Sequence, residues 1–220
     1  MPEIEEPTPG NDSVNELYVQ VLQKHILYTD DTGRFPIRAR SGNQYVMVAY
    51  HYSNVALAEP FSSRKGKNRL AAYNSIMQQL KEKCLLVDLH ILDNECSKEY
   101  QATIRNKWKV QFQLVPPDMY RRNAAEQTIW TFKAHLLAIL SGVDTYFPRH
   151  FWDILLPQTE ITLNLLRQAT ANPAISPWKY FNGKFNYNAT PLGPFRIIVI
   201  FHTKTVRQKS WDFRVKMAGV

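Results

Sequence analysis

Three carboxylates stand at positions where α/β proteins build active sites. Asp30 follows a short strand-like segment, Asp93 ends an apolar segment, and Glu126 lies in the first turns of a helical segment. The carboxyl ends of strands and the start of a following helix converge at one edge of an open α/β sheet. Converging carboxylates repel one another unless a divalent cation lies between them. Two cations about 3.5–4 Å apart on such carboxylates are the arrangement that catalyses phosphoryl transfer.

The same carboxylates also have a purely structural interpretation. Asp is a common turn-forming residue at the end of a strand, and Glu stabilises a helix N-terminus through the helix dipole. On position alone this structural interpretation is the better one. Further motifs are needed before the chemical interpretation is preferred.

Hydrophobic periodicity predicts the segments that must position the carboxylates. Runs rich in β-branched and aromatic residues indicate strands, and apolar residues at helical spacing indicate amphipathic helices. Strands are expected at 25–28, 44–52, 55–59, 85–92, 108–115 and 196–202, and helices at 67–83, 97–106, 123–141 and 152–170.

The order of these segments predicts the fold class. Three strands come first, followed by a helix, a strand, a short helix, a strand and two long helices. Consecutive strands favour antiparallel pairing, and strands that alternate with helices favour parallel pairing. We therefore expect an α/β fold in which helices flank a mixed five-stranded sheet. Residues 85–92 are almost uniformly apolar, which is typical of a strand in the middle of such a sheet.

Charge is distributed unevenly along the chain. The 220 residues carry 27 Lys and Arg against 19 Asp and Glu, a net charge of +8. Residues 1–23 contain five acidic and no basic side chains, so the remainder carries a net charge of +13. A basic body favours a polyanionic partner, nucleic acid before a membrane surface. Plain solubility is the alternative explanation.

Composition divides the chain into three expected regions. Residues 1–23 are acidic and contain several prolines, which is typical of a disordered leader. Residues 24–170 hold the periodic segments of the predicted core. Residues 171–220 mix aromatic and basic side chains and are expected to form an extension that contacts nucleic acid.

Several classes of protein are excluded by what the sequence lacks. No apolar run approaches the ~18 residues that a membrane-spanning helix needs, and the first residues do not resemble a signal peptide. Two cysteines, Cys84 and Cys96, indicate a reducing compartment. The six histidines show no metal-ligand spacing with them. We therefore expect an intracellular protein with no membrane partner.

Motifs around the three carboxylates occur in a specific order. The motifs are Asp30-Asp31-Thr32-Gly33 followed by Gly42-Asn43-Gln44-Tyr45-Val46, then Leu92-Asp93-Asn94, then Asn123-Ala124-Ala125-Glu126-Gln127, and finally LNLL at 163–166 and SPWKYFNGK at 176–184. In this order the chain resembles the catalytic core of retroelement integrases, especially those of copia-type retrotransposons. That family shares a ribonuclease-H-like fold with retroviral integrases.

The resemblance implies an activity and a role for each carboxylate. Asp30 would contact both metal ions, Asp93 would complete one metal site and Glu126 the other. The Asp-x-x-Gly register selects Asp30 over the neighbouring Asp31. Oxygen-only ligands favour Mg²⁺, with Mn²⁺ as a substitute. The implied reactions are 3′-end processing and strand transfer of retroelement DNA, performed in the nucleus on host DNA by a homo-oligomer.

The predicted helix after Asn123 has a face that could contact DNA. Lys133 lies two turns beyond Glu126 on the same stripe, and the resemblance implies that a Lys at this offset contacts the DNA end. A solvated surface Lys is the alternative. Trp130 lies on the same stripe, and its expected role is packing rather than base stacking.

Other basic residues are candidates for phosphate contacts. Two arginines lead into the helix, and two lysines lie in the aromatic-rich extension. Such side chains contribute salt-dependent affinity for phosphates, although loop solubility is an equal alternative for the arginines. The expected nucleic-acid contacts are Arg121, Arg122, Asn123, Lys133, Lys179 and Lys184.

Departures from the family pattern keep a second hypothesis open. Gln127 stands where the family usually has Arg, and Ala124 stands where it usually has Gly. The second hypothesis is a catalytically decayed, retrotransposon-derived module that binds nucleic acid. Hydrolysis of an RNA–DNA hybrid would use the same fold and metals, but the extension does not favour it.

Overall fold

A computed structural model describes most of the chain. The described residues are 25–93, 96–115, 124–143, 145–190, 192–193, 198–202 and 215–219. For Asp93, Ala124, Ala125 and the last two strands, the description covers the backbone. The predicted leader at 1–23 lies outside the described residues.

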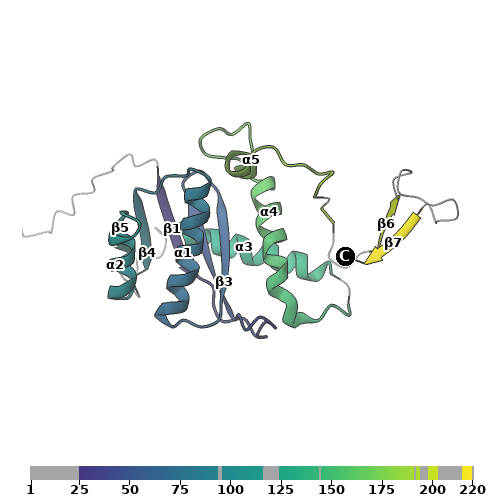
Figure 1. Ribbon diagram of the computed structural model, residues 1–220, viewed down its shortest axis with the longest axis horizontal. Coiled ribbons are helices and arrows are strands. Elements are labelled where there is room, and N and C mark those ends of the chain that lie inside the picture. Colours follow the sequence, from purple (N-terminus) through teal and green to yellow (C-terminus); the bar gives the residue numbers. More distant parts are fainter. Residues whose placement is uncertain are drawn as a thin grey trace, which may run out of the picture.

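Five strands form a mixed sheet, as the order of the segments predicts (Figure 1). The spatial order is β3-β2-β1-β4-β5. The first three strands pair antiparallel, and β4 lies parallel to both β1 and β5. The strands are β1 (Ile26–Asp31), β2 (Tyr45–His51), β3 (Ala56–Phe61), β4 (Leu89–Asp93) and β5 (Gln111–Val115).

Helices cover both faces of the sheet (Figure 1). One face packs against α1 (Gly66–Glu82) and α2 (Lys98–Asn106). The other packs against α3 (Ala124–Ser141), the 3₁₀ helix η2 (Arg149–Leu155) and α4 (Leu156–Leu166). Helix α5 (Pro177–Asn182) packs on α4, and β6 (Ile198–His202) pairs with β7 (Val215–Gly219) in a separate two-stranded sheet.

Strand β2 shows why a strand inside this sheet is apolar at successive positions. Val46 and Val48 are buried against α3 and its neighbours, whereas Met47 and Ala49 are buried against α1 and α2. Side chains alternate between the two faces of a strand, so a sheet covered on both faces needs apolar residues at every position. The structure therefore has two cores, one on each side of the sheet.

Helix α4 protects the free edge of β3. The Asn164 side chain accepts a hydrogen bond from the Ala56 N–H (2.9 Å) and donates one to the Ala56 carbonyl (2.7 Å). Glu160 accepts a hydrogen bond from the Ala58 N–H (3.0 Å). The next outward position is Pro60, which has no N–H. The edge is therefore closed to pairing with another strand.

Removing the Asn164 amide should destabilise the protein. Asn164→Ala leaves a buried N–H and a buried carbonyl without partners, and each costs roughly 1–3 kcal/mol. We expect the free energy of unfolding in urea to fall by about 2–4 kcal/mol. Leu166→Ala is the matched control, because Leu166 is 76% exposed on the same helix and should change stability by less than about 0.5 kcal/mol. Equal losses would contradict this role for Asn164.

Some predicted segments differ from the structure in their extent. The expected strand at 85–92 begins at Leu89, and the expected helix at 152–170 divides into η2 and α4. Pro157 lies in the first turn of α4, where its missing N–H costs nothing. Helix α5 and strand β7 were not predicted. Among the described helices, none is both long and apolar enough to cross a membrane.

Candidate active site

Two of the candidate carboxylates lie on adjacent parallel strands. The pairing of β1 with β4 matches Ile26 with Leu89 and Tyr28 with Ile91. Two residues beyond that last pair, in both strands, come Asp30 and Asp93. The backbone therefore places these residues side by side at the carboxyl ends of neighbouring strands, which is where open α/β sheets form their sites.

Asp30 and Asp31 belong to opposite faces of the sheet. Thr29 is buried on the α1 and α2 side, where its hydroxyl lies 2.8 Å from His90 Nε2. Because successive positions of a strand alternate between faces, Asp31 shares this side and Asp30 takes the α3 side. The Asp31 carboxylate is 5% exposed and pairs with Arg69 Nε at 2.7 Å. Asp31 thus joins β1 to the first turn of α1.

Asp30 keeps its carboxylate close to the backbone. Its Oδ1 accepts a hydrogen bond from the Asp31 N–H at 2.7 Å, and its side chain is half-buried. A carboxylate held in this way is oriented before any ligand arrives, which lowers the entropy cost of binding one.

Glu126 lies on the same side of the sheet as Asp30. It is half-buried in the first turn of α3, and α3 packs on β1 and β2. Thr128 and Tyr50 line one recess, and Tyr50 is the register partner of Tyr28. The first turns of α3 therefore lie beside Tyr50 of β2 and the β2–β3 turn, on the face of the sheet that Asp30 takes.

The donor set is suited to a hard cation. All three candidates offer carboxylate oxygens, the ligands that Mg²⁺ and Mn²⁺ prefer. Among the side chains that the structure describes, no three His, Cys, Asp or Glu residues form a group that could hold a metal ion. The Asp93 side chain is not among those described, so the complete triad stays a prediction.

The predicted DNA face of α3 is partly described. Arg121, Arg122 and Asn123 lie outside the described residues. Lys133 is half-buried two turns after Glu126. Trp130 is 73% exposed, so the expectation that it packs is wrong. The buried side chains of the described part of the helix are those of Thr128, Ile129, Phe132 and Leu136.

Lys179 and Lys184 lie at the opposite end of the sheet from Asp30. Helix α1 begins beside Asp31, through Arg69, and ends at Glu82. At that far end Lys83 lies over the ring of Phe181 in α5. The 17 residues of α1 rise roughly 1.5 Å each, about 25 Å in total. The fold thus separates these lysines from the carboxylates by about the length of α1.

No sequence pattern indicates a role for Arg167. Its guanidinium donates a hydrogen bond to the Asn54 carbonyl (2.7 Å) and lies 5.7 Å from the centre of the Tyr50 ring. Burial lowers its pKa. It lines the recess of about 230 Å³ next to the start of α3, together with Tyr50, Asn54, Gln127, Thr128 and Thr131. A single Arg after a helix carries no sequence signal, because only the tertiary fold brings it to α3.

Similarity to solved structures, rather than to known sequences, supports the fold. Models of protein families and curated protein sequences give no match. The BIV integrase catalytic core matches with a TM-score of 0.51 at 13% identity, over 72% of this chain and 94% of that one. The HTLV-2 integrase catalytic core, solved with magnesium in a dimeric form, matches with a TM-score of 0.52 at 15% identity, over 74% of this chain and 99% of that one.

A third solved structure covers more of the chain. It is the simian T-cell lymphotropic virus intasome in complex with PP2A regulatory subunit B56 gamma, with a TM-score of 0.54 at 16% identity, over 88% of this chain and 70% of that one. Identities this low establish the fold alone. The fold is that of an integrase catalytic core, and the ribonuclease-H-like mixed sheet is confirmed.

Proposed function

We propose that this chain is the catalytic core of a copia-type retrotransposon integrase. Its activity would be metal-dependent polynucleotidyl transfer, comprising 3′-end processing and strand transfer of retroelement DNA. The observation that carries the proposal is the β1–β4 register, which sets Asp30 beside Asp93 on an integrase-core fold. The start of α3, with Glu126, lies over the same side of the sheet.

Each carboxylate has a defined part in the proposal. Asp30, Asp93 and Glu126 would hold Mg²⁺, for which Mn²⁺ could substitute. When bound, the metal lowers the pKa of the attacking water or 3′-hydroxyl and stabilises the leaving oxygen. The Asp31–Arg69 ion pair joins the end of β1 to α1 on the other face of the sheet, and the Asp31 N–H holds the Asp30 carboxylate.

Basic and aromatic side chains would position the DNA. Lys133 and the exposed Trp130 follow Glu126 along α3, and Arg167 lies beside the start of that helix. The arginines and asparagine that precede α3, Arg121, Arg122 and Asn123, would contact phosphates. Lys179 and Lys184, about 25 Å away, would contact the same duplex about seven base pairs further on, at ~3.4 Å per base pair.

The proposal extends to assembly and location. We propose that the chain acts as a homo-oligomer in the nucleus, on element ends and host target DNA. Support comes from the neighbours, one of which is a dimeric form and another an intasome.

The experiment that tests the proposal is a strand-transfer assay. Duplexes with the terminal sequences of the retroelement that encodes this chain are incubated with Mg²⁺ or Mn²⁺ and plasmid target. We expect joined products that chelation of the metal removes and that Glu126→Gln abolishes. Glu99→Gln, an exposed carboxylate on α2, is the control and should leave the products unchanged. Products that persist in Glu126→Gln, or none with the wild-type chain, would overturn the proposal.

A catalytically silent DNA-binding module is the second candidate. Gln127 in place of the usual Arg, together with the exposed Trp130, favours it. It predicts binding that is sensitive to salt and independent of metal. Strand transfer that Asp93→Asn abolishes would dismiss it.

Trp130 and Lys133 should contribute differently to DNA binding. Trp130→Ala removes a stacking surface, and we expect affinity for a frayed DNA end to fall about 5- to 50-fold. Lys133→Ala should reduce the slope of log affinity against log salt by about one. Leu137→Ala, 63% exposed on the same helix, is the matched control. Fluorescence anisotropy at several salt concentrations measures both effects, and equal affinities for all three variants would contradict these assignments.

A further inference from the structure

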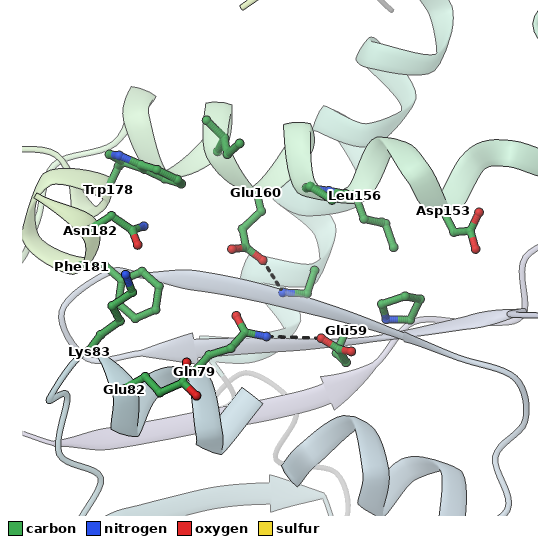
Figure 2. A pocket seen from close by; sticks show the side chains of 14 residues that line it. Glu59, Gln79, Glu82, Lys83, Asp153, Leu156, Glu160, Trp178, Phe181 and Asn182 are labelled. Carbon is green, nitrogen blue, oxygen red and sulfur yellow. Dashed lines mark hydrogen bonds between the residues drawn. The ribbon is translucent and has the colours of Figure 1, made fainter. Parts of the chain in front are cut away.

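A cavity of about 430 Å³ opens at the β3 edge of the sheet, two strands away from β1 and its candidate carboxylates. It lies between β3, the end of α1, α4 and α5 (Figure 2). Four carboxylates contribute to its lining, from Glu59, Glu82, Asp153 and Glu160. Trp178 and Phe181 of α5 supply an aromatic wall. Cavities of this size accommodate a ligand group rather than a single water.

Glu160 is the carboxylate at the centre of the cavity. Its Oε2 accepts the Ala58 N–H (3.0 Å), and Figure 2 shows its side chain pointing from α4 into the cavity. Glu59 comes from the strand opposite, where it accepts a weak hydrogen bond from Gln79 (3.4 Å). Burial and the nearby charge of Glu59 raise the pKa of Glu160 to about 7, against the hydrogen bond from Ala58, which lowers it. Among the described residues neither carboxylate has an ion-pair partner, and the ammonium of Lys83 belongs to the same lining.

The other charged groups at the cavity already have partners. Asp153 accepts hydrogen bonds from the Ser41 hydroxyl and from Asn43 (3.2 Å), and Glu82 accepts one from Gln78 (2.9 Å). Lys83 lies with its ammonium 5.8 Å from the centre of the Phe181 ring. This contact shows that the aromatic wall accepts a cation on its face. Among the described residues that line the cavity, Lys83 is the single cationic one.

We propose that this cavity binds the side-chain cation of a lysine or arginine from a basic segment of a partner protein. Carboxylates repel DNA phosphates, so the cavity does not extend the DNA surface. The lining carboxylates, as far as the structure describes them, form no group of three that could hold a metal ion. An ammonium or guanidinium satisfies Glu160 and Glu59 by charge-assisted hydrogen bonds and stacks on Trp178 or Phe181. The proposal is independent of the integrase assignment.

Binding of such a cation is linked to the protonation of Glu160. A positive charge beside the carboxylate favours its ionised form, so binding near pH 6 releases a proton from Glu160. The affinity should therefore rise between about pH 6 and pH 8, because less work is then spent on deprotonation. A cation attracted only to the outer surface releases no proton.

The test uses the full chain and a fluorescein-labelled peptide of alternating lysine and glycine. We expect saturable binding that weakens about tenfold or more in Glu160→Gln and in Trp178→Ala, and no binding of a glutamate–glycine peptide. Glu160→Gln retains the acceptor for the Ala58 N–H, so the fold is preserved. Glu99→Gln is the control for a surface carboxylate elsewhere and should bind like the wild type.

Calorimetry in two buffers of different ionisation enthalpy then counts the protons. We expect release of a fraction of a proton near pH 6 in the wild type and none in Glu160→Gln. Equal peptide affinity in Glu160→Gln and Glu99→Gln would overturn the proposal, because binding would then arise from diffuse surface charge. Wild-type binding without proton release would overturn it as well.

Discussion

Asp30→Asn should abolish strand transfer while the protein stays folded. Loss of the charge at a predicted metal-binding position should lower the rate about a thousandfold or more, roughly 4 kcal/mol of activation free energy. The free energy of unfolding should change by less than about 1 kcal/mol, because Asp30 is half-buried and contributes to neither core cluster. Single-turnover strand transfer and urea denaturation measure the two quantities.

Asp31→Asn is the matched comparison, and we expect the reverse result. Its carboxylate is 5% exposed and pairs with Arg69, so the substitution removes an ion pair with a partly buried guanidinium. Asn keeps one acceptor oxygen, and we therefore expect a loss of about 1–3 kcal/mol in stability. Strand transfer per folded molecule should stay within a few-fold of the wild type.

The pair of variants separates chemistry from structure at adjacent positions. Both assays must be performed at a temperature where Asp31→Asn remains folded. If Asp31→Asn abolished the reaction and left stability unchanged, the assignment of Asp30 by the Asp-x-x-Gly motif would be wrong. The two faces of β1 would then have exchanged roles, which the burial of Thr29 against His90 argues against.

Local pattern was sufficient to predict much of the fold. The helix expected at 67–83 is observed at Gly66–Glu82, and the one expected at 123–141 at Ala124–Ser141. Long amphipathic helices can be predicted from the helical spacing of their apolar residues. The motif selected Asp30 over Asp31, and the strand alternation supplies an independent physical reason for that choice.

The features that sequence reasoning missed depend on distant partners. Glu160 and Asn164 cap backbone groups of β3 that lie more than 100 residues earlier in the chain. Arg167 reaches the start of α3 only through the path of α4. Trp130 was misjudged because an aromatic residue on a helix usually packs, and only the position of the sheet shows that its side faces solvent.

Glu160 should make the stability of the protein depend on pH. Its pKa is about 7 in the folded chain, against an ordinary value of 4.5. Between these values the folded state holds a proton that the unfolded state releases, so stability falls as pH rises. The slope is about 1.4 kcal/mol per pH unit. The contribution is complete below about pH 4.5 and is lost above about pH 7, on the order of 3 kcal/mol.

Glu160→Gln should remove this loss of stability at higher pH. Gln carries no charge and can still accept the Ala58 N–H, so we expect the variant to exceed the wild type by about 2–3 kcal/mol near pH 8 and to equal it near pH 4.5. Urea denaturation across this range measures the difference. Glu59→Gln is the companion variant and should act in the same direction, because burial also raises the pKa of Glu59.

The effect of Glu160 must be measured as the difference in stability between the wild type and Glu160→Gln. Buried histidines change the stability with pH in the opposite direction. Burial lowers the pKa of His90 to about 3 and also lowers that of His51. Their unfolded forms bind protons below about pH 6.5, so they reduce stability as pH falls. That contribution is common to the wild type and Glu160→Gln, and it cancels in the difference. A difference that did not change with pH would show that the Glu160 carboxylate is well hydrated, and its capping of β3 would then be its whole role.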